Sequence, residues 1–80
     1  NYPNPFNPIT SILFDISNQS HAILKVYDVT GREVTVLVNE SLRPGKYKVN
    51  FNAGNLSSGL YFYKLETENF TQTRKMVLVK

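Results

Sequence analysis

The residues that could carry out chemistry in this chain are few and widely separated. His21 is the only histidine and there is no cysteine, so neither a histidine cluster nor a thiolate metal site can form. No serine lies in the Gly-x-Ser-x-Gly pattern of a hydrolase nucleophile. Asp15 and Asp28 could approach each other, but paired carboxylates need a concave site that 80 residues rarely build. The sequence therefore predicts no enzyme, no cofactor and no metal.

An apolar run at the end of the sequence is the strongest candidate for a binding site. The run reads Lys75-Met76-Val77-Leu78-Val79-Lys80. Alternation places Met76 and Leu78 on one face of a strand, and Val77 and Val79 on the other. The flanking lysines could simply guard an apolar edge against aggregation. Alternatively, a partner could add a strand to this edge or bind the chain terminus. The residues alone favour neither interpretation, and such a strand could also pair weakly with that of a second copy.

Three tyrosines offer another candidate surface. Alternation puts Tyr61 and Tyr63 on one strand face beside Leu65, and Tyr47 lies in an earlier strand. Together they could form an aromatic platform that stacks against sugars. Core tyrosines whose hydroxyls reach the rim of the domain are the more usual explanation, and we expect that one. A carbohydrate-binding module remains the alternative.

Length and charge set the class of protein. Eighty residues suffice for one small domain. Nine basic residues are scattered among six acidic ones, which leaves a net charge of +3. A nucleic-acid surface would cluster its basic residues on one element, so we expect no nucleic-acid partner. No apolar stretch reaches the roughly 18 residues of a membrane span. Since no methionine begins the sequence, we expect a C-terminal piece of a longer polypeptide.

The first nine residues differ in composition from the rest. Residues 1–9 hold three prolines among asparagines and aromatic residues. Proline fixes φ and removes an amide donor, so this segment is predicted to be an extended lead-in. Tyr2 and Phe6 are expected to anchor it to a domain that spans residues 10–80.

Apolar residues then alternate with polar ones, as in half-buried strands. Gly31 is expected to take a positive φ, Pro44-Gly45 to form a type II turn, and Leu56 to point inward from a polar loop. No segment has a helical period. The pattern predicts an all-β fold without significant helix: a small antiparallel immunoglobulin-like β-sandwich of six to seven strands. A five- or six-stranded barrel is the alternative. The strands are expected near residues 10–16, 22–26, 34–38, 47–51, 60–65 and 70–79.

Five motifs, taken in order, resemble one family. They read Tyr2-Pro3-Asn4-Pro5-Phe6-Asn7-Pro8-Ile9-Thr10, Val26-Tyr27-Asp28-Val29-Thr30-Gly31-Arg32-Glu33-Val34, Pro44-Gly45-Lys46-Tyr47-Lys48-Val49, Leu56-Ser57-Ser58-Gly59-Leu60-Tyr61-Phe62-Tyr63 and Lys75-Met76-Val77-Leu78-Val79-Lys80. The chain resembles, over nearly its whole length, the type A C-terminal sorting domain of the type IX (Por) secretion system of Bacteroidetes. The immunoglobulin-like domain of flagellar hook-capping proteins shares the opening motif and the Gly-Leu-Tyr segment, so the opening alone does not decide.

The resemblance implies a non-catalytic signal at the end of a larger cargo protein. Such cargo crosses the inner membrane by a separate leader and passes from the periplasm through the outer-membrane type IX translocon. A sortase-like peptidase commonly removes the domain, and the cargo reaches the cell surface or the medium. Glycines set the backbone and tyrosines pack, so we expect residues 75–80 to be the signal and the rest its scaffold. A structural immunoglobulin-like accessory domain of a surface or hook-cap protein is the alternative. By the resemblance, recognition falls on Pro44, Gly45, Tyr47, Gly59, Tyr61, Lys75, Met76, Val77, Leu78, Val79 and Lys80.

Overall fold

The described part of the chain is built entirely from strands. A computed structural model describes residues 9–54 and 56–79. Residues 1–8, with the expected anchors Tyr2 and Phe6, lie outside the described residues, as do Asn55 and Lys80. No described residue is helical, which confirms the all-β class. The six strands are β1 (Ile9–Ile16), β2 (Ser20–Asp28), β3 (Glu33–Leu42), β4 (Gly45–Asn52), β5 (Gly59–Glu66) and β6 (Thr71–Leu78).

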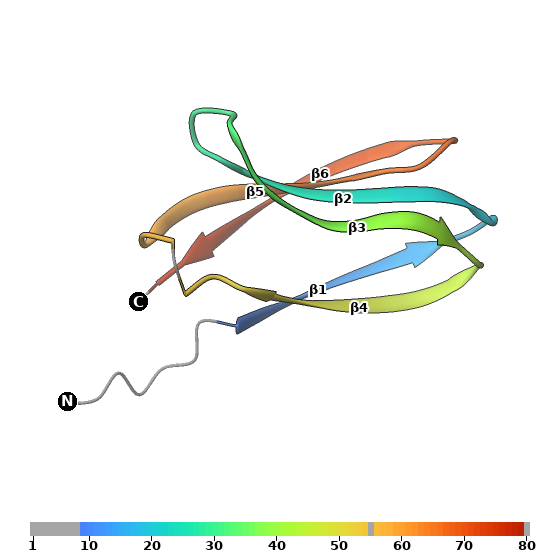
Figure 1. Ribbon diagram of the computed structural model, residues 1–80, viewed down its shortest axis with the longest axis horizontal. Coiled ribbons are helices and arrows are strands. Elements are labelled where there is room, and N and C mark those ends of the chain that lie inside the picture. Colours follow the sequence, from blue (N-terminus) through green and yellow to red (C-terminus); the bar gives the residue numbers. More distant parts are fainter. Residues whose placement is uncertain (1–8, 55, 80) are drawn as a thin grey trace.

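The strands form two antiparallel sheets of unequal size. One sheet contains β1 and β4, and the other has the order β3-β2-β5-β6. The two sheets lie one above the other, with β1 and β4 forming the lower layer in Figure 1. This arrangement is a sandwich and not a closed barrel, in agreement with an immunoglobulin-like architecture.

The core lies between the sheets and follows the alternation of the sequence. Along β2, Ala22, Leu24 and Val26 are fully buried, whereas the residues between them are more exposed. Leu56 also packs against the core from its loop, as predicted. Such alternation arises because successive side chains of a strand point to opposite faces. The buried core residues are Ile12, Phe14, Ile16, Ala22, Leu24, Val26, Phe51, Ala53, Tyr61, Leu65 and Leu78.

The turn after β2 is organised by one carboxylate. Asp28 Oδ1 accepts hydrogen bonds from the Thr30 amide (2.9 Å), the Thr30 hydroxyl (2.6 Å) and the Arg32 amide (3.0 Å). The Thr30 hydroxyl is the main reason that the pKa of Asp28 lies below its usual value. Gly31 has a φ of 89°, which confirms the expected positive φ. Asp28 and Gly31 thus fix this reversal through local contacts.

Three predicted details were wrong. Gly45 has a φ of 154°, far from the +80° or so of a type II turn, because here the chain passes from one sheet to the other. Ser20 lies before the expected strand at residues 22–26, yet it already belongs to β2 and pairs with Leu42. In β3 the simple alternation fails. Register shifts leave two extra residues, Val34 and Leu37, without a partner opposite in β2, and both pack against the core.

Candidate functional site

Two bends of the chain share a pattern that the sequence analysis did not single out. Leucine, glycine and tyrosine recur with the spacing Leu-x-x-Gly-x-Tyr at residues 42–47 and 56–61. In each bend the glycine opens a strand, β4 or β5. This repeated spacing was the signal by which sequence reasoning could have found the two bends, which we call the tyrosine corners.

Each corner is closed by its tyrosine hydroxyl. Tyr47 donates a hydrogen bond to the carbonyl oxygen of Arg43 (2.6 Å), and Tyr61 donates one to that of Ser57 (2.9 Å). Gly45 and Gly59 have φ values of 154° and 148°, a backbone conformation that residues with a Cβ rarely adopt. Immunoglobulin-like domains use a similar tyrosine to tie a corner to the backbone a few residues upstream. These four motif residues therefore stabilise the bends.

The corners lie at opposite ends of the sandwich (Figure 1). Gly45 is paired with Ile16, at the end of β1, whereas Gly59 is paired with Leu78, at the end of β6. Tyr61 is paired with Met76 in the same ladder. The structure thus brings Gly59 and Tyr61 beside the terminal strand and leaves the exposed Pro44, with Gly45 and Tyr47, at the far end. The candidate residues do not form one surface.

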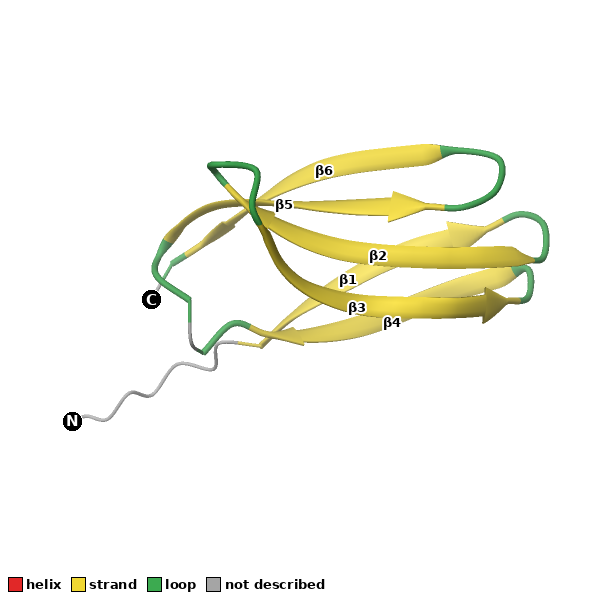
Figure 2. Cartoon of the chain, turned by 45° about the horizontal axis from the view of Figure 1, so that its top comes forward, coloured by secondary structure: helices red, strands yellow, loops and turns green. Residues whose placement is uncertain are grey.

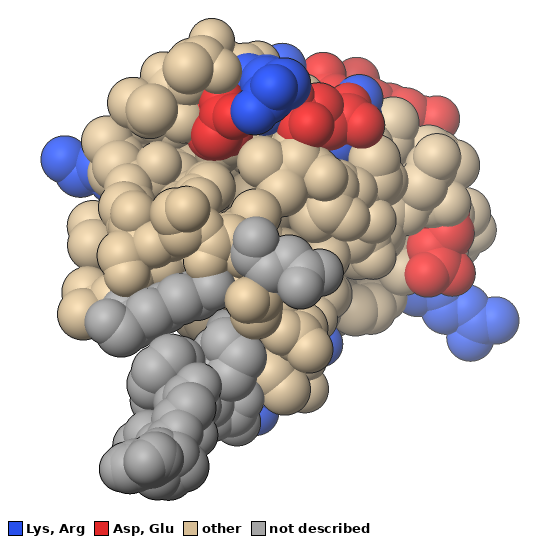
Figure 3. Space-filling model, turned by 60° about the vertical axis from the view of Figure 1, so that its left-hand side comes forward, with Lys and Arg blue, Asp and Glu red and all other residues tan. Residues whose placement is uncertain are grey.

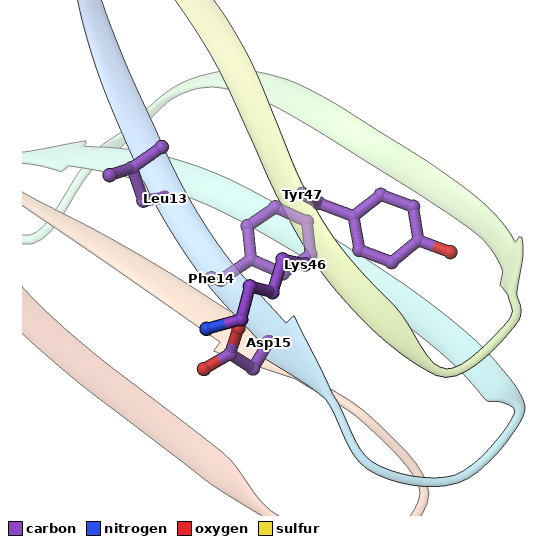
Figure 4. Close-up of a pocket in the computed structure, with 5 residues that line it drawn as sticks. All are labelled: Leu13, Phe14, Asp15, Lys46 and Tyr47. Carbon is purple, nitrogen blue, oxygen red and sulfur yellow. The ribbon is translucent and has the colours of Figure 1, made fainter.

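The tyrosines do not form an exposed platform for sugars. Tyr61 is only 8% exposed and belongs to the core, and Tyr63 is half-buried beside it. The Tyr47 ring stacks on Phe14 across β1 and β4, with centroids 5.5 Å apart (Figure 4). Asp15 and Lys46 border the same open depression, of about 310 Å³. The expected packing role is confirmed for Tyr61, which leaves no aromatic surface at this position.

The terminal strand has one buried and one exposed face. Leu78 is buried in the core, and Met76 packs against it. Val77 and Val79 are 66% and 83% exposed, and Lys75 is exposed. Both faces were predicted from the alternation, and this prediction is confirmed. In the described part of the chain β6 pairs with β5 alone, so its outer edge is open. Lys80 lies outside the described residues.

Charged side chains form small local pairs. Lys25 lies 3.2 Å from Glu33, Arg32 lies 3.3 Å from Asp28, and Lys64 lies 3.6 Å from Glu66. The hydrogen bond to Glu33 is the main reason that the pKa of Lys25 is raised. Basic and acidic groups lie side by side on the face shown in Figure 3, without a broad field of one sign. This distribution gives that face no feature of a nucleic-acid surface.

Neither a metal-binding cluster nor a membrane-spanning helix is found among the described residues. His21, the only histidine, is exposed and hydrogen-bonded to Asn39 on the neighbouring strand. No group of three or more histidine, cysteine or acidic residues lies together in residues 9–54 and 56–79. The same residues include no helix that is long and apolar enough to cross a membrane.

The geometry defines a β-sandwich of immunoglobulin-like architecture whose last strand ends in exposed apolar residues. A family described as the secretion system C-terminal sorting domain matches residues 1–80. The chain therefore belongs to the type IX secretion C-terminal sorting domains, a family of Bacteroidetes whose members are generally non-catalytic. Comparisons with curated proteins and with solved structures gave no match.

Proposed function

We propose that this domain is the export signal of a larger cargo protein and that the type IX translocon reads it at the end of β6. The observation that carries the proposal is the two-faced terminal strand. Leu78 fixes the strand to the core, while Val77 and Val79 remain more than half exposed. An anchored strand with an open edge and an apolar outer face is suited to strand addition by a partner.

The rest of the proposed recognition set acts as the scaffold of that signal. Gly59 and Tyr61 hold the start of β5, against which the end of β6 is paired. Pro44, Gly45 and Tyr47 shape the far end of the sandwich and reach the signal only through the fold. The translocon would thus contact residues 75–80 directly and depend on the corners for their placement.

Export would place the domain in the periplasm in transit and the cargo at the cell surface or in the medium. In this proposal residues 1–9 link the cargo to the sandwich, and a sortase-like peptidase of the type IX system removes the domain. Family membership supports this sequence of events, because a sorting domain requires a cargo in cis and a machine that recognises it. The open apolar edge of β6 would also let two copies pair weakly at high concentration.

A reporter experiment tests the signal. A secreted reporter fused to residues 1–80 is expected to reach the surface of a host with a type IX system, whereas a fusion that lacks Val77–Lys80 stays in the periplasm. Because this deletion removes the core residue Leu78, a second variant keeps Leu78 and replaces only Val77 and Val79 by aspartate. A matched control replaces Val36, an exposed valine of the opposite edge strand β3, by aspartate.

The control variant is expected to be exported like the unaltered domain, and the double variant is expected to stay in the periplasm although it folds. Export of the double variant at the unaltered level would contradict recognition at Val77 and Val79. Loss of export for the control as well would show that delivery follows general surface polarity and not this strand.

A further inference from the structure

Four strands form the edges of the two sheets, and the edges differ in how they are protected. β3 carries two register irregularities, which disturb pairing with an additional strand. β4 carries the exposed Lys46 and Lys48, and β6 carries the exposed Arg74 and Lys75. Lysines, arginines and bulges are the devices by which proteins keep other chains from adding to a sheet. The edges of β3 and β4 are thus protected, and that of β6 is protected as far as Lys75, before the open end proposed above as the export signal.

The edge of β1 lacks this protection. β1 contains no lysine or arginine, its single charged residue Asp15 lies next to its end, and its register with β4 runs unbroken from Ile9 to Ile16. Leu13, in the middle of the strand, is 68% exposed. Among the described residues β1 pairs with β4 alone, so its other side is open to an additional strand.

The four-stranded sheet extends sideways beyond the open edge of β1. Figure 2 shows β6 at the upper margin of the four-stranded sheet. β1 and β4 run behind β2 and β3, lower in the same view. Gln72 and Arg74 of β6 are paired with Leu65 and Tyr63 of β5, and Leu65 is buried in the core. Gln72 and Arg74 therefore belong to the inner face of the sheet, yet both are exposed. They are exposed because neither β1 nor β4 covers them.

An open groove occupies the space between this overhang and β1. It has a volume of about 460 Å³, and we call it the β1–β6 groove. Its lining comes from one side of β1 and from the inner face of β5 and β6. The lining residues are Ser11, Leu13, Phe14, Asp15, Tyr63, Gln72 and Arg74.

We propose that the β1–β6 groove binds one extended peptide segment of a partner, which adds to β1 as the third strand of the smaller sheet. Neighbouring strands lie roughly 4.8 Å apart, so a strand added to β1 would lie under β6. Its backbone would pair with the open edge of β1, and its inward side chains would contact Tyr63, Gln72 and Arg74. This site lies on a different strand from the export signal and does not depend on it.

The lining determines which peptide fits. The outward side chain that would lie beside Leu13 is expected to be apolar. The side chains that face inward would meet Gln72 and Arg74 and are expected to be polar. No carboxylate of the described residues forms an ion pair with Arg74, so one inward position is expected to be acidic. The ligand is an extended segment of alternating apolar and polar residues with an acid facing Arg74.

A second copy of the domain does not fit this groove. If β1 paired with β1 of another copy, each smaller sheet would bring its own four-stranded layer with it. The larger layer overhangs β1 in both copies, so the two β6 strands would be forced into the same space. Only a segment without a covering layer of its own can enter.

The test is a titration of the isotopically labelled 80-residue chain, followed by nuclear magnetic resonance. The probe is the peptide acetyl-Thr-Val-Glu-Val-Thr-Val-Thr-amide, which places its valines on one face and its glutamate on the other. A control peptide has lysine in place of glutamate. Saturable shifts are expected at the amides of Ser11–Asp15 and at Gln72 and Arg74, with weaker binding of the lysine peptide.

Matched variants locate the binding edge. Leu13→Lys gives β1 the protection that β4 already has. This substitution is expected to lower the affinity for the glutamate peptide by about ten-fold or more. Val36→Lys, at an exposed position of the edge strand β3, is expected to leave the affinity unchanged. Arg74→Glu is expected to reverse the preference, so that the lysine peptide binds more tightly than the glutamate peptide.

Three results would overturn the proposal. These are the absence of saturable shifts, equal affinity for Leu13→Lys and the unaltered chain, and shifts confined to the outer edge of β6 or β3. Sedimentation of the chain without peptide provides a further check. A dimer that Leu13→Lys abolishes would assign the edge of β1 to self-association and contradict the argument from the overhang.

Discussion

The tyrosine corners and the end of β6 carry motif residues of the same family, but their side chains lie in different places. Tyr61 is buried, with its hydroxyl bonded to a carbonyl of its own loop, and Tyr47 is stacked on Phe14. Val77 and Val79 project away from the core. Motif positions in this small sandwich thus divide into those that pack within the fold and those that stay exposed at its surface.

The two corners also differ from each other. Tyr61 faces the core and lies beside the end of β6, whereas the Tyr47 hydroxyl is exposed at the opposite end of the molecule. The same local pattern therefore contributes differently to stability according to what packs around it. Substitutions that separate these regions can sharpen or break this comparison.

Replacing Tyr61 by alanine is expected to have the largest effect. Loss of a buried aromatic side chain typically costs about 3–5 kcal/mol of unfolding free energy, because packing is lost and a cavity remains. Tyr47→Ala is expected to cost less, since Tyr47 is only partly buried. Urea unfolding followed by circular dichroism measures both. Equal losses for the two variants would contradict the assignment of different roles to the corners.

The glycines of the corners should resist substitution for a backbone reason. A Cβ on Gly59 would have no atom within 4 Å, so Gly59→Asn is expected to cost about 1–3 kcal/mol from its φ of 148° alone. Gly31→Asn is the matched control, because asparagine tolerates a φ near 89° far better. A comparison of urea midpoints tests this difference. If Gly31→Asn were as destabilising as Gly59→Asn, the backbone argument would be wrong.

Removal of the corner hydroxyls should have a smaller effect. Tyr61→Phe loses a partly buried hydrogen bond and is expected to lower the free energy of unfolding by about 1 kcal/mol. Tyr47→Phe loses an exposed one and is expected to cost about 0.5 kcal/mol. Thermal unfolding of the two variants under identical conditions measures the difference. A larger loss of stability for Tyr47→Phe than for Tyr61→Phe would contradict the different surroundings of the two hydroxyls.

The smallest effect concerns acid stability through Asp28. Its pKa is lowered in the folded state, so its ionised form favours folding above the unfolded value of about 3.9. That contribution is lost as the pH falls through the lower, folded pKa. Asp28→Asn is expected to flatten the fall in urea midpoint between about pH 6 and pH 2. If the urea midpoint of Asp28→Asn fell toward low pH as steeply as that of the unaltered chain, this role of Asp28 would be excluded.

Local patterns made much of the fold predictable. Alternation in β2 identified Ala22, Leu24 and Val26 as core residues, and all three are fully buried. The residues of the turn after β2 predicted the positive φ of Gly31, because aspartate and glycine act there through contacts within five residues. In these segments the local preference and the tertiary fold agree.

Features that depend on distant pairing could not be predicted in the same way. The register of β1 with β4 joins Thr10 to Phe51, and no periodicity along the chain specifies that partner. The extra residues Val34 and Leu37 in β3 defeat the simple alternation because they depend on how β3 fits β2. The type II turn at Gly45 was predicted from local residues and failed where the chain changes sheets.

The candidate sites follow the same division. The two faces of the terminal strand were predicted because Met76, Val77 and Leu78 alternate in an apolar run. The β1–β6 groove was not predicted, because it arises from the unequal width of the two sheets. The packing of the corners depends on what surrounds each tyrosine, which the repeated spacing does not specify.

The central claim is that the exposed face at the end of β6 is read by the export machinery while the rest of the domain holds it in place. The most direct measurement compares surface delivery and urea midpoint for the same variant, Val77→Asp combined with Val79→Asp. Because both side chains are exposed, the free energy of unfolding derived from the urea titration is expected to change by no more than about 0.5 kcal/mol, whereas delivery of the reporter is lost. Unchanged delivery of this folded variant would contradict the claim.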